Sequence, residues 1–172
     1  PTVVVFIDEA VTDFATIANA VPEGAEVHYL DSDRDGLEQI AEVLAGRTDV
    51  DAIHIVSHGE AGKLYLGSGE LTSDSMSGEH ADELSLIKAA LSDDADILIY
   101  GCDVAGGDSG NAFVSDLAAA TGADIAASTD TTGGEEPGGN WVLESQTGSI
   151  ETPAITLDTY SGVLARTNSG TW

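Results

Sequence analysis

The feature that most restricts the fold of this chain is a series of short apolar runs separated by segments with helical spacing. The main predicted strands are residues 2–7 (TVVVFI), 25–30 (AEVHYL), 52–57 (AIHIVS) and 96–100 (DILIY), followed by shorter ones at 124–127 and 141–144. Continuous apolar runs are typical of parallel strands buried on both faces. Because helical segments alternate with them, the sequence predicts an α/β fold with a mostly parallel central sheet flanked by helices.

The helical segments show apolar residues three and four positions apart. They are predicted at 11–21, 37–44, 84–91 and 111–121. Between residues 60 and 80 the chain is rich in Gly and Ser, and a small hairpin near 64–66 is the only element predicted there.

A length of 172 residues fits one domain. We place that domain at 1–164, with a polar, flexible tail at 165–172. Since the first predicted strand begins directly after Pro1, we expect the chain to be part of a longer protein.

Two side chains suited to nucleophilic catalysis, an imidazole and a thiol, follow two of these predicted strands. His58 comes after the run 52–57, and Cys102 comes one glycine after the run 96–100. In parallel sheets, catalytic groups gather at the carboxyl ends of the strands, and these strands are candidates for adjacent central positions. A thiol attacks as the thiolate, for which an imidazole supplies both a base and a counter-charge. The backbone N–H groups of Gly59 and Cys102 are the predicted oxyanion donors.

The alternative for this pair is purely structural, with a buried cysteine and a strand-end histidine that hydrogen-bonds a loop. The other three histidines are assigned no catalytic part. His54 is predicted to point away from the face of its neighbours Ile53 and Ile55 and to be structural, because side chains alternate along a strand. His28 lies within a predicted strand and His80 in a loop.

Two segments resemble those of a known group of peptidases. The runs IHIVSHG at 53–59 and ILIYGCD at 97–103 look like the caspase-like (clan CD) cysteine peptidases. Within that group the chain resembles most an uncharacterised domain family found near the N-termini of giant bacterial repeat adhesins and calcium-binding surface proteins. The resemblance covers nearly the whole chain, including GNWVLE at 139–144 and YSGVL at 160–164.

This resemblance implies a caspase-like three-layer sandwich in which His58 is the general base or proton shuttle and Cys102 is the nucleophile. The histidine of caspases precedes the cysteine by about 50 residues, close to the separation here. The sequence around Cys102 departs from the caspase signature Gln-Ala-Cys-X-Gly, so caspase specificity for aspartate does not carry over.

The function implied is a cysteine endopeptidase that needs no cofactor and processes itself or a large bacterial surface or adhesin protein. Its substrate would be a polypeptide, including its own parent chain, and its location would be extracellular or on the cell surface. The alternative is a non-catalytic caspase-like module used in secretion or adhesion, with calcium binding as a further option.

The large negative net charge of this chain excludes some classes of binding partner. Five Lys and Arg stand against 31 Asp and Glu, which gives a formal net charge of −26. Such a surface repels nucleic acid and anionic membranes. No apolar run approaches the roughly 20 residues that span a bilayer. From the charge and from this absence we predict neither nucleic-acid binding nor membrane insertion.

Asp103 and Asp108 would favour a basic residue before the cleaved bond. With one cysteine, no internal disulfide can form.

One acidic segment matches the calcium loop pattern D-x-D-x-D-G-x5-E. Its candidate ligands are Asp31, Asp33, Asp35 and Glu42. A strand is predicted before the loop, where an EF-hand has a helix. The alternative, which we favour, is an Asp-rich turn in which Asp35 caps a helix that begins near Gly36.

Overall fold

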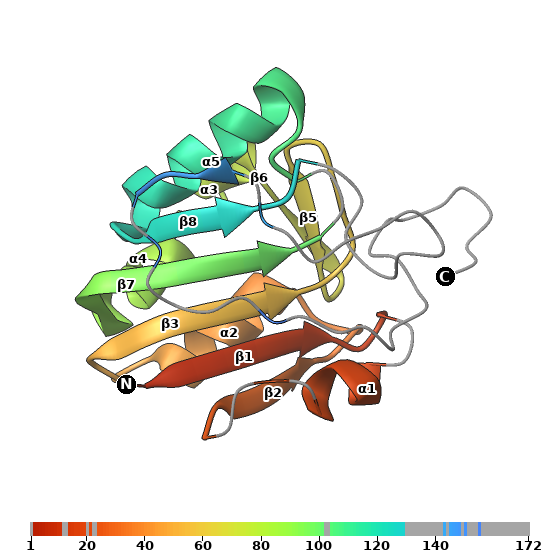
Figure 1. The fold of residues 1–172 in the computed structure, drawn as a ribbon, viewed down its shortest axis with the longest axis vertical. Helices are drawn as coiled ribbons and strands as arrows, with labels where there is room; N and C mark the ends of the chain where they lie inside the picture. Colours follow the sequence, from red (N-terminus) through yellow and green to blue (C-terminus); the bar gives the residue numbers. More distant parts are fainter. Residues whose placement is uncertain are drawn as a thin grey trace.

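A computed structural model describes residues 2–11, 14–19, 21, 24–101, 104–129, 143, 145–148, 150 and 155. Its central sheet has six strands in the order β2-β1-β3-β7-β8-β9. These are β1 Val3–Asp8, β2 Glu26–Leu30, β3 Val50–Val56, β7 Leu91–Tyr100, β8 Asp124–Ala127 and β9 Ser145–Gln146. The first five strands in this order pair in parallel, and β9 pairs antiparallel with β8. Figure 1 shows the arrowheads of β1, β3, β7 and β8 at one common edge of the sheet.

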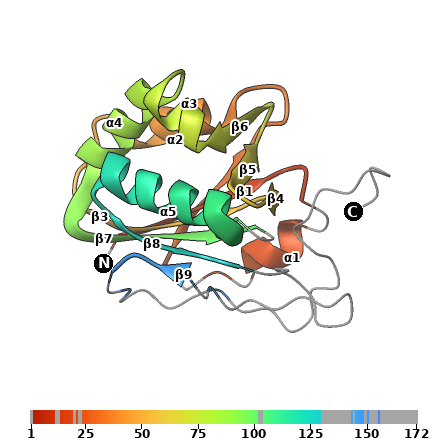
Figure 2. The ribbon, with the colours of Figure 1, turned by 90° about the horizontal axis from the view of Figure 1, so that it is seen from above.

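Helices cover both faces of this sheet, as the alternating pattern predicts. They are α1 Phe14–Asn19, α2 Gly36–Leu44, α3 Ser73–Ser77, α4 Ala81–Ala90 and α5 Gly107–Thr121. Figure 2 shows α2 to α5 above the sheet and α1 below it. The protein is therefore an α/β fold with a mostly parallel central sheet, and its layers fit a three-layer sandwich.

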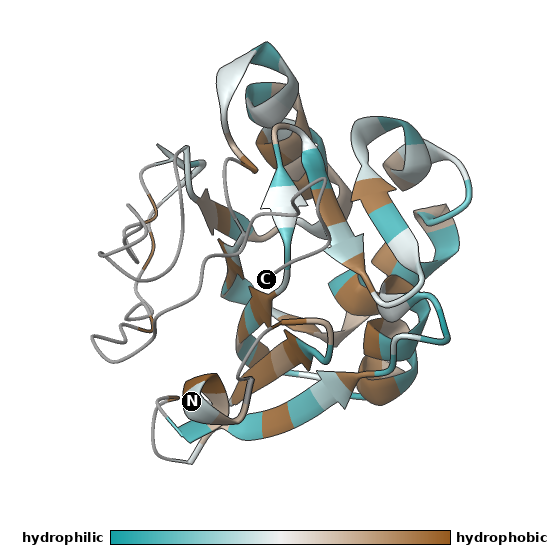
Figure 3. Ribbon diagram, turned by 90° about the vertical axis from the view of Figure 1, so that its right-hand side faces the viewer, coloured by the Kyte–Doolittle hydropathy of each residue, from teal (hydrophilic) through white to brown (hydrophobic). Residues whose placement is uncertain are grey.

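The core is divided by the sheet into two apolar clusters. Along β7, Ile97 and Ile99 join the cluster beneath α2 to α5, whereas Leu98 and Tyr100 join the cluster that contains Ile17 of α1. This alternation follows from the pleat, which sends successive side chains to opposite faces. Figure 3 shows the resulting bands of hydrophobic residues along the strands.

The Gly- and Ser-rich segment forms a second, small sheet beside the carboxyl end of the central one (Figure 1). Its strands β4 Gly59–Glu60, β5 Lys63–Leu66 and β6 Gly69–Thr72 pair antiparallel in chain order. The predicted hairpin is thus one part of a three-stranded unit. Helix α3, which the apolar pattern did not predict, follows β6 and begins with a capping box between Thr72 and Ser75.

Some predicted boundaries differ from the structure, and some predictions cannot be compared with it. Helix α4 ends at Ala90, and Leu91 already belongs to β7, which is longer than the predicted strand. Of the predicted strand 141–144 only Leu143 is described, and the predicted tail 165–172 lies outside the described residues. None of the helices in the described part of the chain combines the length and apolarity that crossing a membrane requires.

Candidate functional site

The two strands that precede His58 and Cys102 lie side by side at the centre of the sheet. β3 and β7 pair in parallel with Val56 opposite Tyr100, and the N–H of Ser57 donates to the carbonyl of Tyr100 over 3.1 Å. The prediction that these strands are adjacent is therefore confirmed. In the sequence His58 follows Val56 by the same number of residues as Cys102 follows Tyr100. Cys102 and Asp103 lie outside the described residues, so the structure describes the histidine half of the predicted site.

The imidazole of His58 is held by a backbone carbonyl from the neighbouring strand end. Its side chain is buried, with the residue 1% exposed, and Nε2 lies 3.0 Å from the carbonyl oxygen of Ala10. A carbonyl oxygen can only accept a hydrogen bond, so Nε2 carries the proton and donates it. In the neutral ring the lone pair is then on Nδ1, which makes Nδ1 the basic nitrogen.

The backbone around His58 is fixed by the second sheet. The N–H of Tyr65 in β5 donates to the carbonyl of His58 over 2.9 Å, and the hydroxyl of Ser57 donates to the carbonyl of Tyr65. Further along, the N–H of Gly62 donates to the carbonyl of Val104 over 3.0 Å, which ties the second sheet to the segment after β7. The second sheet therefore holds the main chain of His58 and the side chain of Ser57, independently of the imidazole contact.

Gly101 allows the ends of β3 and β7 to approach each other. A Cβ at this position would lie 3.1 Å from the carbonyl oxygen of Ser57 and 3.2 Å from a methyl group of Leu64. These distances are closer than ordinary van der Waals contact. A glycine directly before Cys102 thus removes a side chain that would crowd the strand end bearing His58.

Asp8 is a residue of this site that the sequence reasoning missed. It is the last residue of β1, is buried, and accepts a hydrogen bond from the N–H of Ala10 over 2.8 Å. It therefore shapes the turn whose carbonyl binds His58. The available signal was an aspartate directly after the apolar run 2–7, at the carboxyl end of a predicted parallel strand.

The described positions of Gly59 and Asp108 do not test their predicted roles. Gly59 begins β4 directly after His58 and pairs with Leu64 of β5, so its predicted oxyanion role stays a prediction. Asp108 is exposed in the first turn of α5.

His54 is structural, on the face that the strand pattern predicts. It is fully buried, and its Nδ1 forms a hydrogen bond with the hydroxyl of Tyr100 over 2.9 Å. The same hydroxyl accepts from the N–H of Ile155 over 2.8 Å. Burial lowers the pKa of His54 to about 4, against a smaller opposing effect of Asp96. The ring is therefore neutral at pH 7.

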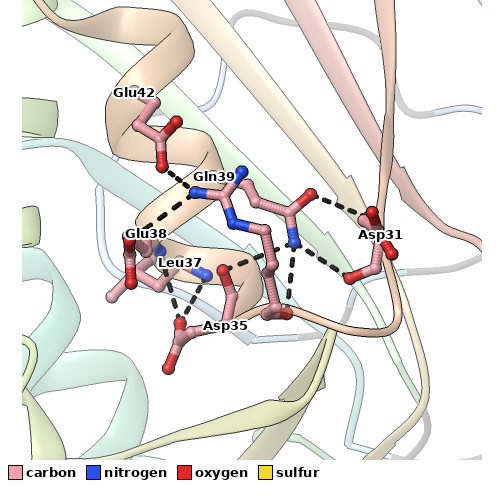
Figure 4. Close-up of polar contacts among 7 residues, drawn as sticks. Asp31, Asp35, Leu37, Glu38, Gln39 and Glu42 are labelled. Carbon is pink, nitrogen blue, oxygen red and sulfur yellow. Dashed lines mark hydrogen bonds and ion pairs between the residues drawn. The ribbon is translucent and has the colours of Figure 1, made fainter.

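The acidic loop is a helix cap rather than a gathered set of metal ligands (Figure 4). The Oδ1 atom of Asp35 accepts from the N–H groups of Leu37 and Glu38 over 2.9 and 3.3 Å, which confirms Asp35 as the N-cap of α2. The carboxylate of Glu42 forms an ion pair with Arg34, a cationic residue of the loop. Within the described ranges no three His, Cys, Asp or Glu side chains form a group that could hold a metal ion. The structure thus does not bring Asp31, Asp33, Asp35 and Glu42 together.

The Asp35 carboxylate also binds a histidine from a distant part of the chain. Its Oδ2 lies 2.8 Å from Nε2 of His80, which is 2% exposed at the start of α4. Asp35 therefore joins the beginnings of α2 and α4.

We expect Asp35→Ala to lower the free energy of unfolding by about 1–3 kcal/mol, because α2 loses its cap and a buried imidazole loses its acceptor. Urea denaturation at pH 7 measures the change. The exposed Asp33 in the same loop gives the matched control, since Asp33→Ala should change the value by no more than about 0.5 kcal/mol. Equal losses in both variants would contradict the capping role.

Comparisons with known proteins add a family assignment. No curated protein and no solved structure matches the chain. A family model described as a domain of unknown function (DUF4347) matches residues 4–164, which is nearly the whole chain and includes both predicted strand-end residues. The protein therefore belongs to the DUF4347 family of domains.

Proposed function

We propose that this protein is a cysteine endopeptidase of the caspase-like type, with His58 as the base and Cys102 as the nucleophile. The observation that carries the proposal is the hydrogen bond from Nε2 of His58 to the carbonyl of Ala10, which leaves Nδ1 as the basic nitrogen. It is supported by the pairing of β3 with β7, whose sequence continues through Gly101 to Cys102.

The reaction that these groups support is acyl transfer. Nδ1 of His58 takes the thiol proton, and the thiolate attacks the carbonyl carbon of the scissile peptide bond. The N–H groups of Gly59 and Cys102 stabilise the negative oxygen of the tetrahedral intermediate. The imidazolium then gives its proton to the leaving amine, and the peptide C–N bond breaks to leave a thioester. His58 next takes a proton from water, which hydrolyses the thioester and restores the thiol. The Ala10 carbonyl supports the charged ring, because a hydrogen bond from an imidazolium is stronger than one from a neutral ring.

The proposed substrate is a polypeptide, first of all the longer chain of a bacterial surface or adhesin protein to which the domain itself belongs. Cleavage within one chain needs little substrate groove, because the effective concentration of a tethered bond is high. The net charge of −26, with Asp103 and Asp108 near the nucleophile in sequence, supports a basic residue before the cleaved bond. The chemistry itself requires no cofactor, and calcium is proposed only as a modulator.

The experiment uses a longer chain that extends well past Trp172, incubated with and without Ca²⁺ and followed by intact mass. We expect a discrete fragment from the unchanged sequence, and none from Cys102→Ala or His58→Ala. The matched control is His28→Ala, which removes a partly exposed histidine of β2 that pairs with Glu26, and this variant should still be cut. A fragment that persists in Cys102→Ala would exclude the proposed nucleophile.

The burial of His58 favours one second candidate. A histidine that is 1% exposed and bound to a loop carbonyl also suits a structural role. In that case the domain is a non-catalytic module for secretion or adhesion. This alternative predicts no fragment under either calcium condition and a slowly reacting Cys102.

A further inference from the structure

The carboxylate of Asp8 is buried at the end of β1 and is bound by backbone N–H groups. The residue is 2% exposed, its Oδ1 accepts from the N–H of Ala10 over 2.8 Å, and its Oδ2 accepts from the N–H of Gly67 over 2.7 Å. Among the described residues no ion pair involves Asp8. A buried carboxylate without a cation is costly unless its oxygens are hydrogen-bonded. Its two oxygens therefore hold two separate backbone segments in place.

The first of these segments is the turn that binds the His58 ring. The side chain of Asp8 accepts from Ala10, and the carbonyl of Asp8 accepts from the N–H of Val11 over 3.0 Å. Both hydrogen bonds close the turn after β1. The carbonyl of Ala10 projects from this turn to Nε2 of His58 at 3.0 Å. The N–H group that binds the Asp8 carboxylate and the carbonyl that binds the His58 ring therefore belong to the same residue, Ala10.

The second segment is the turn between β5 and β6. Gly67 has a φ of +60°, and a Cβ there would lie 2.1 Å from the carbonyl oxygen of Arg34, so this turn is tightly packed. Strand β5, which leads into it, donates from Tyr65 to the carbonyl of His58. One carboxylate therefore anchors both the contact to the His58 side chain and the strand that holds its main chain.

We propose that Asp8 is a positioning residue for His58, which keeps the ring proton on Nε2 and thereby leaves Nδ1 as the basic nitrogen. The catalytic consequence rests on the proposed function, whereas the effect on the ring does not. Removing the carboxylate should free the Ala10 turn and the turn at Gly67, so the Nε2–H group loses a fixed acceptor while the strands of the sheet remain.

The test compares Asp8→Ala with Asp96→Asn, which changes another buried carboxylate (1% exposed) in β7, where Asp96 pairs with Ala52 rather than with the strand end. The first readout is the exchange of the His58 Nε2 proton with solvent, followed by nitrogen-15 NMR. We expect slow exchange in the unchanged protein and in Asp96→Asn, and exchange at least tenfold faster in Asp8→Ala. The second readout is alkylation of Cys102 by iodoacetamide at pH 6, which should slow by about tenfold in Asp8→Ala alone, the net loss of rate expected when an imidazole no longer stabilises the thiolate.

The outcomes separate this inference from the proposed function. If the ring proton stays protected and alkylation is unchanged in Asp8→Ala, the positioning role is wrong. If the ring proton is lost but Cys102 is unreactive even in the unchanged protein, Asp8 positions the ring and the peptidase proposal fails. Should Asp8→Ala not fold, Asp8→Asn serves instead. An amide oxygen can accept from only one of the two segments, so the same changes are expected at smaller size.

Discussion

Cys102 is expected to react with iodoacetamide at pH 6 about tenfold faster than the same cysteine in a His58→Gln variant. An isolated thiol is half ionised only near pH 8.5, so well under about 1% is thiolate at pH 6. A neighbouring imidazole that accepts the proton raises this fraction by about two orders of magnitude. The more readily formed thiolate is also a weaker nucleophile, with a Brønsted slope of about 0.4–0.5, which reduces the net gain to about tenfold.

The measurement is direct because the chain contains one cysteine, so intact mass reports Cys102 alone. The rate should be nearly constant between pH 6 and pH 8 in the unchanged protein. In His58→Gln it should fall by about tenfold for each pH unit as the pH is lowered from 8 to 6, as for an isolated thiol. His28→Gln is the matched control and should keep the flat profile. Coinciding profiles for the unchanged protein and His58→Gln would mean that the imidazole and the thiol do not interact.

The free energy of unfolding is expected to fall by about 3 kcal/mol between pH 6.5 and pH 4 because of His54 alone. Burial lowers the pKa of this histidine from 6.5 to about 4 in the folded protein. Across this window the unfolded chain binds a proton that the folded protein does not bind, so acidification favours unfolding, by about 1.4 kcal/mol per pH unit. Above pH 6.5 His54 contributes no pH dependence, and below about pH 4 its loss is complete because both states are protonated.

Urea denaturation at steps from pH 8 to pH 4 tests this effect in the unchanged protein and in His54→Asn. The Asn side chain does not titrate, and its amide can still form a hydrogen bond with the hydroxyl of Tyr100, as donor or as acceptor. The many acidic groups common to both proteins cancel in the difference between them, so the unchanged protein should lose about 3 kcal/mol more than His54→Asn. An equal slope in His54→Asn would show that the ring is not held neutral.

Much of the architecture can be predicted from local patterns, for a physical reason. A strand buried on both faces is mostly apolar, so β1, β3 and the second half of β7 are visible as nearly continuous apolar runs. Similarly, the cap of α2 depends on contacts within three residues, from Asp35 to Glu38, and the sequence therefore predicts it. The sheet order was predictable only in part, namely that β3 and β7 are neighbours.

Features without an apolar signature were harder to predict. Helix α3 is mostly polar, and its only local signal is the reciprocal bonding of Thr72 and Ser75. The short β9 gains its place by pairing with β8, and nothing in its own two residues requires a strand. These elements depend on neighbours that the pattern of their own residues does not specify.

The candidate site divides in the same way. The sequence by itself determined that His58 and Cys102 follow strands of one parallel sheet, because hydrophobic burial is recorded residue by residue. Only the tertiary structure decided which ring nitrogen of His58 carries the proton, because its Nε2 donates to the carbonyl of Ala10, which is distant in the chain. The tertiary structure likewise decided the hydrogen bond between Asp8 and Gly67 and the one between Asp35 and His80. Such hydrogen bonds need two segments to be adjacent in space, and that adjacency is created by the packing of the sheets and helices rather than by any local preference of the residues involved.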